Sequence, residues 1–204
     1  MDPDREWWLR VPAVLLSPRS VFAALRNEER EDVEARAEPV LALTLLAGVA
    51  VALGTSTART LYDDPLFDHA TLAVWAVIAG GFVAFSGYFI VGGALYLGAR
   101  GLGSAGTFRR ARHVLGFAVT PLALSALLLW PLGLAVFGTD LFRRGGADEG
   151  ADGDLFYALT IGCSLWALAL LLLGVRVVHG WSWWRSLGAL ALVALFLAAF
   201  SYVF

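Results

Sequence analysis

The residues best suited to bind a charged partner lie where a long apolar run breaks, in the stretch "GVRVVHGWSWWRSL". Arg176 and His179 are one helical turn apart there, and Arg185 follows after three tryptophans. Side chains three residues apart share a helix face, so this pair could contact an anionic lipid headgroup or a protein partner. The same residues also suit a plain turn between two membrane crossings, with tryptophans at headgroup depth. The sequence leaves both interpretations open.

A second basic group precedes another apolar run, in the stretch "GTFRRARHVLGF". Thr107 is placed to cap a helix that carries Arg109, Arg110 and Arg112. Near an anionic inner leaflet each such charge gains about 1 kcal/mol. These arginines could therefore form an acidic-lipid or partner contact, and simple positive-inside anchoring at the membrane surface explains the same residues.

A third group is acidic and lies in the stretch "YDDPLFDH". Asp63, Asp64, Asp68 and His69 could form a weak divalent-cation site, and an enzyme could use such a cluster. A solvated acidic loop accounts for the same residues. The chain has no glycine-rich phosphate loop after a strand, no paired metal motif and no nucleophile–base spacing. We therefore expect no catalytic residue, no metal site and no cofactor.

The composition is that of a membrane protein. Apolar residues make up 59 % of the 204, against roughly 45–50 % in soluble domains. Only 16 % of the residues are charged, and the net charge of -2 gives no indication of nucleic-acid binding. The apolar residues also form long blocks. These features predict an all-α, polytopic protein embedded in lipid.

Five apolar blocks meet the length of about 20 residues that a spanning helix needs. They predict a five-helix transmembrane domain over residues 39–204, preceded by a segment of residues 1–38 with short interfacial helices. The predicted crossings are approximately 39–58, 71–98, 114–138, 155–175 and 186–204.

The arginines predict the orientation. Only Arg59, Arg143 and Arg144 fall on one side of the predicted crossings, and every other arginine falls on the opposite side. Cytoplasmic loops are enriched in basic residues, so the N-terminus should be cytoplasmic and the C-terminus external, in the cell membrane. The acidic start "MDPDREWW" lacks the pattern of a cleaved signal peptide.

The predicted crossings contain few groups for chemistry. Ala76, Gly80 and Ala84 recur at every fourth position and predict a helix-packing seam, which could also support self-association. No charged residue falls in the middle of a predicted crossing, which favours a non-enzymatic protein. Pro121 and Pro131 should bend the third crossing, and an alternative is a transporter or channel subunit with a path near them.

Three segments together resemble the Yip domain family of five-crossing membrane proteins. They are "LLSPRSVFAAL", "GTFRRARHVLGFAVTP" and "LWALALLLLGVRVVHGWSWWRSL", and the resemblance covers roughly residues 15–200. It implies a five-crossing fold and a membrane location, and no activity. The charge-free crossings, the small-residue stripe and the interfacial N-terminal edge favour a role through protein or lipid contacts. Eukaryotic members interact with Rab-type GTPases, but this chain lacks their Asp-Leu-x-Gly-Pro signature and carries Phe117 at the tyrosine of the Gly-Tyr-x-x-x-Pro pattern. The resemblance therefore does not extend to Rab binding.

Overall fold

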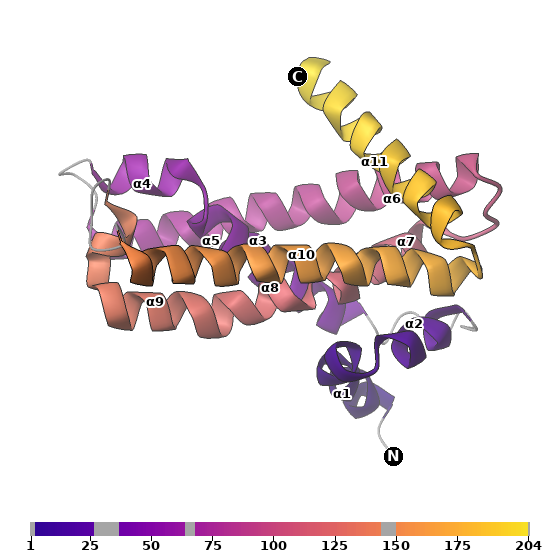
Figure 1. Cartoon of the computed structure of the whole chain (residues 1–204), viewed down its shortest axis with the longest axis horizontal. Helices are drawn as coiled ribbons and strands as arrows, with labels where there is room; N and C mark the ends of the chain where they lie inside the picture. The colour runs from indigo at the N-terminus through magenta and orange to yellow at the C-terminus, as the bar shows by residue number, and fades with distance from the viewer. Residues whose placement is uncertain (1–2, 27–36, 64–67, 144–149, 204) are drawn as a thin grey trace.

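The computed structural model describes residues 3–26, 37–63, 68–143 and 150–203, and these residues form helices without any β-strand (Figure 1). The prediction of an all-α membrane protein is confirmed. The elements in chain order are α1 (Pro3–Leu16), α2 (Pro18–Arg26), α3 (Ala37–Leu53), α4 (Ser56–Tyr62), α5 (His69–Ser86), η2 (Gly87–Val91), α6 (Gly92–Gly101), α7 (Phe108–Ala118), α8 (Thr120–Leu124), η3 (Ser125–Leu129), α9 (Trp130–Phe137), η4 (Gly138–Phe142), α10 (Ala151–His179) and α11 (Trp183–Val203).

Within the described ranges, four helical segments are long and apolar enough to cross a membrane. They are Ala70–Gly101, Thr120–Phe137, Ala151–His179 and Trp183–Phe200. Only 17–33 % of the most apolar window of each segment is buried inside the protein. Helices that leave so many apolar side chains uncovered require lipid rather than water around them.

Helix α3 is shorter than the first predicted crossing. Its 17 residues span about 26 Å, against a hydrocarbon thickness of about 30 Å. The helix stops at Leu53, where the Thr55 hydroxyl donates a hydrogen bond of 2.7 Å to the Ala52 carbonyl, and α4 begins at Ser56. Four spans therefore meet the length requirement, and α3 is a shorter fifth helix of the bundle.

Helices α3 and α5 pack with their backbones in close contact. Ala76, Gly80 and Ala84 are all buried, and Gly80 faces Val49 of α3. A Cβ atom added to Gly48 would lie 2.2 Å from the Gly80 carbonyl oxygen. The absence of side chains at both glycines is what allows this approach, so α3 of the same chain occupies the small-residue stripe.

The stretch from α7 to α9, which holds the third predicted crossing and is called the third span below, contains two irregular turns, each associated with a proline. Regular helix geometry is interrupted at Val119, two residues before Pro121, and a π-helical turn, η3, precedes Pro131. Pro121 thus lies in the first turn of a new helical segment, where its missing N–H leaves no internal hydrogen bond broken. Pro131 lies in continuous helix directly after η3, and such a π-helical turn is a local adjustment that accommodates a proline.

The N-terminal helices cover one side of the bundle (Figure 1). Val21, Phe22 and Leu25 of α2 are buried, and the Phe22 ring lies against Gly174 of α10. Helix α2 therefore directs its apolar face at the bundle rather than at lipid.

Two connections lie at the same end of the bundle. One is the loop of residues 102–107 between α6 and α7, and the other is the turn of residues 180–182 between α10 and α11 (Figure 1). We call this the arginine-rich end. Helices α4 and η4 lie at the opposite end, and α11 diverges from α10 after the turn.

Candidate functional site

The turn between α10 and α11 is built on Gly180. Its φ of 64° is in the left-handed region, which a glycine adopts without steric cost. The Gly180 N–H donates to the Val177 carbonyl and the Trp181 N–H to the Arg176 carbonyl, at 3.3 and 3.0 Å. These two bonds form a Schellman cap, which ends α10 and reverses the chain within three residues.

The side chains of Arg176 and His179 pack on tryptophans beyond this turn. The Arg176 guanidinium carbon lies 4.4 Å from the centre of the Trp183 ring, and the His179 and Trp181 rings stack with centroids 4.6 Å apart. A guanidinium that stacks on a ring still directs its N–H groups outward in its own plane. The turn thus holds a cation at a fixed place: its Nε–H is buried without a hydrogen-bond partner among the described residues, and the two terminal NH₂ groups are the donors left for a ligand.

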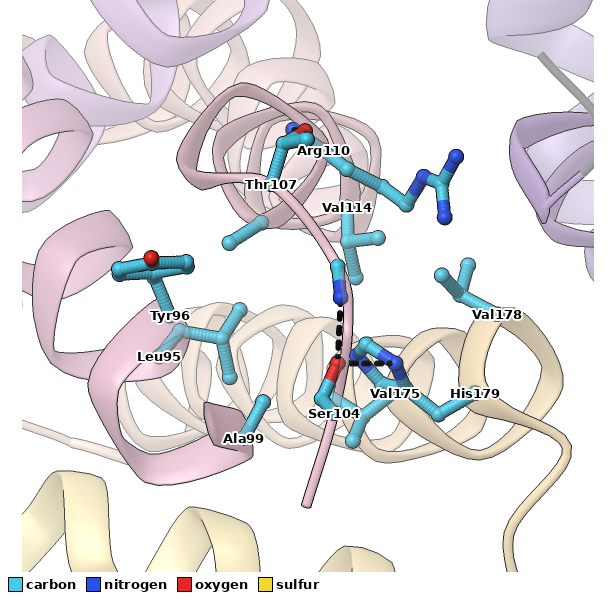
Figure 2. Close-up of a pocket in the computed structure, with 12 residues that line it drawn as sticks. Leu95, Tyr96, Ala99, Ser104, Thr107, Arg110, Val114, Val175, Val178 and His179 are labelled. Atoms are coloured by element: carbon cyan, nitrogen blue, oxygen red, sulfur yellow. Dashed lines mark hydrogen bonds between the residues drawn. The ribbon is translucent and has the colours of Figure 1, made fainter. Parts of the chain in front are cut away.

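The loop of residues 102–107 contacts the turn directly. The Ser104 hydroxyl oxygen lies 3.1 Å from Nδ1 of His179 and accepts a 2.9 Å hydrogen bond from the Gly106 N–H (Figure 2). Arg185 donates to the Leu102 carbonyl oxygen and stacks on Trp181, with its guanidinium carbon 4.5 Å from the ring centre. Two connections far apart in sequence therefore form one unit.

Arg110 and His179 line a small pocket between α6, α7 and α10 (Figure 2). Its apolar walls include Leu95, Val114 and Val175. The volume is about 10 Å³, enough for roughly one water molecule. The arrangement is thus a packed junction, and a ligand larger than water would have to bind on its surface.

Arg112 occupies a different environment from its two neighbours in sequence. Its guanidinium carbon lies 4.4 Å from the Phe108 ring centre, 4.6 Å from that of Tyr88 and 5.4 Å from that of Phe89. Tyr88 belongs to η2, near the midpoint of the span Ala70–Gly101. Arg112 therefore lies beside the middle of that helical span, against three aromatic rings.

The structure thus separates the basic residues of the two sequence groups. Arg110, Arg176, His179 and Arg185 gather at the arginine-rich end, while Arg109 is exposed nearby and Arg112 lies within the bundle.

Within the described part of the chain, Arg110, Arg176 and Arg185 form no ion pair with an acidic side chain. The described partners of these cations are aromatic rings and a backbone carbonyl, so their charges are not neutralised there.

Several residues of this junction were not selected from the sequence. Ser104 and Gly106 lie in "GLGSAG", whose composition indicates only a flexible turn. A Cβ atom on Gly106 would lie 3.1 Å from Cε1 of His179, and one on Gly103, where φ is +84°, would lie 3.2 Å from a nitrogen of Arg185. The small residues of this loop allow His179 and Arg185 to lie close to its backbone. The sequence alone does not show which segment the loop contacts.

The acidic cluster predicted from "YDDPLFDH" lies at the opposite end, and among its described residues Asp68 caps a helix. Asp68 is the N-cap of α5 and accepts hydrogen bonds of 2.7 Å from both the backbone N–H and the hydroxyl of Thr71, in the first turn of the helix. Asp63 is exposed. Asp64 and the side chain of His69 lie outside the described residues. The described part of the chain holds no group of three or more histidine, cysteine or acidic side chains arranged to bind a metal.

Comparison with known proteins gives one informative match. Neither the curated proteins nor the solved structures give a significant match to the chain. The model of the Yip1 domain matches residues 13–204, which is nearly the whole chain. The matched range includes α2, the arginine-rich end and all four long spans. The chain belongs to the Yip1 domain family of membrane proteins.

Proposed function

We propose that this protein is a non-enzymatic member of the Yip1 domain family that acts through contacts at its arginine-rich end, with anionic lipid headgroups as the principal ligand. Protein partners that present acidic groups, and other copies of this chain, are the further candidates. The membrane character of the family and the four long spans support lipid contact in general. The choice of an anionic headgroup depends on the arrangement of the arginines.

The observation that carries the proposal is the pair Arg176 and Arg185, which flank the turn and stack on Trp183 and Trp181. Tryptophan prefers the membrane interface, so it would hold these guanidinium groups at headgroup depth. A planar guanidinium binds phosphate oxygens through paired N–H donors. Because the described residues supply no acidic partner, a lipid phosphate would provide the missing negative charge.

We further propose that the arginine-rich end is cytoplasmic and that α3 crosses the membrane as a short fifth span of the cell membrane. Helix α3 runs from Val40, which contacts Gly116, toward Gly54, which lies near Trp130 at the other end. Its shortfall of a few ångströms is small enough for local thinning of the bilayer. Reporter fusions at residue 204 and in the loop 99–112 should show an external C-terminus and a cytoplasmic loop; a cytoplasmic residue 204 would contradict this topology.

The lipid contact is tested by tryptophan quenching in phosphatidylcholine nanodiscs. Phosphatidylglycerol brominated on one acyl chain should quench the protein more strongly than phosphatidylcholine brominated at the same position. The difference should shrink in high salt, which screens exposed charges. It should also shrink in the double variant R176Q/R185Q, but not in R143Q at the opposite end. Equal quenching by both lipids would contradict the proposal.

The alternative of a transport path near Pro121 and Pro131 has less support. Thr120 is fully buried, and its hydroxyl donates a 2.7 Å hydrogen bond to the Phe117 carbonyl. Phe117 and Pro121 are fully buried as well. A polar path along this span would require these packed residues to separate. Solute flux in liposomes, lost on Thr120→Val, would support the transporter instead.

A further inference from the structure

A separate cavity of about 460 Å³ lies between α3, the third span and α10. Its volume falls within the range of roughly 300–1,000 Å³ that is typical of small-molecule sites. The lining from α10 comes from residues 157–164, in the first half of that helix and toward the end opposite the arginine-rich end. It includes six residues with polar or aromatic side chains: Thr55, Ser125, Trp130, Tyr157, Thr160 and Ser164.

The cavity follows from two features of the backbone. Helix α3 stops at Leu53, so one further helical turn that would pack against the third span is missing. Gly54 lines the cavity without a side chain, and the nearest side-chain atom to a Cβ added there would be in Trp130, at 3.7 Å. On the facing span, Ser125 opens the π-helical turn η3, an irregularity often found at functional sites. The space is therefore built into the fold.

The lining presents acceptors without charge. The hydroxyls of Thr55, Ser125, Thr160 and Ser164 each donate to a backbone carbonyl of their own segment, at 2.7, 2.7, 2.8 and 3.1 Å. Their protons are occupied, but their oxygen lone pairs still accept hydrogen bonds. No lining residue is charged. Beside the lining, the Arg59 guanidinium carbon lies 4.9 Å from the centre of the Tyr157 ring. A cation would lose its hydration in the cavity without gaining a counter-charge, whereas an uncharged hydroxyl could donate to these oxygens.

One wall of the cavity is rigid and aromatic. The Trp130 ring is parallel to the Phe142 ring at 5.9 Å between centroids and meets the Phe156 ring edge-on at 5.4 Å. At the rim, the apolar side chains of Val51 and Ile161 are 41 % and 59 % exposed on lipid-facing helices. The cavity therefore has hydroxyl oxygens inside and apolar side chains at its rim. A molecule with a small polar end and a hydrocarbon tail would fit both surfaces.

We propose that this cavity binds a neutral lipid alcohol, with its hydroxyl group among Ser125, Thr160 and Ser164 and its hydrocarbon chain along Val51 and Ile161. Diacylglycerols and polyprenols belong to this class. The inference concerns the half of the bundle away from the arginine-rich end, so it does not depend on the anionic-lipid contact.

The test uses the full chain in phosphatidylcholine nanodiscs and 1,2-dioleoylglycerol with a photoreactive diazirine on one acyl chain. Crosslinking should label peptides that contain Val51 or Ile161. Unlabelled dioleoylglycerol should compete, and its 3-O-methyl ether, which lacks the hydroxyl proton and so loses one donated hydrogen bond, should compete about three- to tenfold less well.

Two variants extend the test to the protein. T160V/S164A should weaken labelling about three- to tenfold, because it removes two of the three oxygens that could accept the single hydroxyl proton of the ligand. G54L should weaken it by filling the space, while S86A, at an exposed hydroxyl of α5, should leave it unchanged. Labelling spread evenly over the lipid-facing helices, or equal competition by the ether on the unaltered protein, would overturn the proposal even if a variant failed to fold.

Discussion

The Ser104 hydroxyl oxygen lies 3.1 Å from Nδ1 of His179, although 75 positions separate the two residues in the chain. This contact joins the loop after the α5–η2–α6 span to the turn that leads into α11. Arg185, which donates to Leu102, ties the same two segments together. The positions of the arginines therefore depend on loop–turn packing as well as on the helices that carry them.

Removing the Ser104 hydroxyl should loosen the loop of residues 102–107. Ser104→Ala loses the interactions with both His179 and Gly106, each worth about 0.5–1.5 kcal/mol. Amide hydrogen exchange in the loop should accelerate about three- to tenfold or more. Ser86→Ala, at an exposed hydroxyl of α5, serves as the control. Unchanged loop exchange in S104A would show that the contact does not hold the loop.

Alanine at Gly180 should destabilise the turn. The left-handed φ of 64° costs an L-residue about 1–2 kcal/mol, and the new Cβ would also lie 3.2 Å from Nη1 of Arg26. The midpoint of thermal unfolding in detergent should fall. Gly162→Ala provides the matched control, because this glycine lies within α10 with open space around it. There alanine should be neutral or stabilising by up to about 1 kcal/mol. The reverse order of the two midpoints would contradict the assigned turn geometry.

The packing of α3 on α5 makes Gly48 intolerant of substitution. The methyl group of Gly48→Ala would overlap the Gly80 carbonyl, so the helices must separate, at a cost of about 1–3 kcal/mol. Thermal unfolding should show this loss. Gly81→Ala, one position from Gly80 on α5 but with open space around it, should not destabilise the protein. Similar midpoints for G48A and G81A would mean that the two helices are not in close contact.

Arg112 should require a guanidinium and not merely a positive charge. Lysine keeps the charge but loses the planar group that contacts the Phe108 and Tyr88 rings. We expect Arg112→Lys to lower the free energy of unfolding by about 1–2 kcal/mol. Arg109→Lys, at an exposed position of the same helix, should change it little. If both lysine variants unfold at the same temperature, the aromatic enclosure contributes nothing to stability.

The sequence predicted the helical membrane character because lipid leaves few alternatives: a long apolar block must form a helix there. It did not predict that α3 would stop at Leu53, because Thr55, Ser56, Thr57 and Ala58 are small and uncharged and a charge first appears at Arg59. The end of that helix is decided by local contacts at Gly54 and Thr55 and by the path of the chain into α4.

The candidate site was predictable only in part. Arg176, His179 and Arg185 stand out by their charge within an apolar run. Arg109, Arg110 and Arg112 look equivalent in sequence, yet one is exposed, one lines the junction and one lies beside Tyr88. That difference arises from the rotation of α7 against its neighbours, which spacing alone does not specify. The role of Ser104 likewise depends on a partner 75 positions away.

The central claim is that the arginine-rich end binds anionic headgroups, and native mass spectrometry of the delipidated protein measures this most directly. Phosphatidylglycerol should bind more tightly than phosphatidylcholine, and R176Q/R185Q should weaken only the phosphatidylglycerol complex. At about 1 kcal/mol for each arginine, the loss should be roughly ten- to thirtyfold in Kd. Arg143→Gln, at the opposite end, should leave both affinities unchanged. Equal affinity for the two lipids, or an unchanged phosphatidylglycerol complex in R176Q/R185Q, would contradict the account.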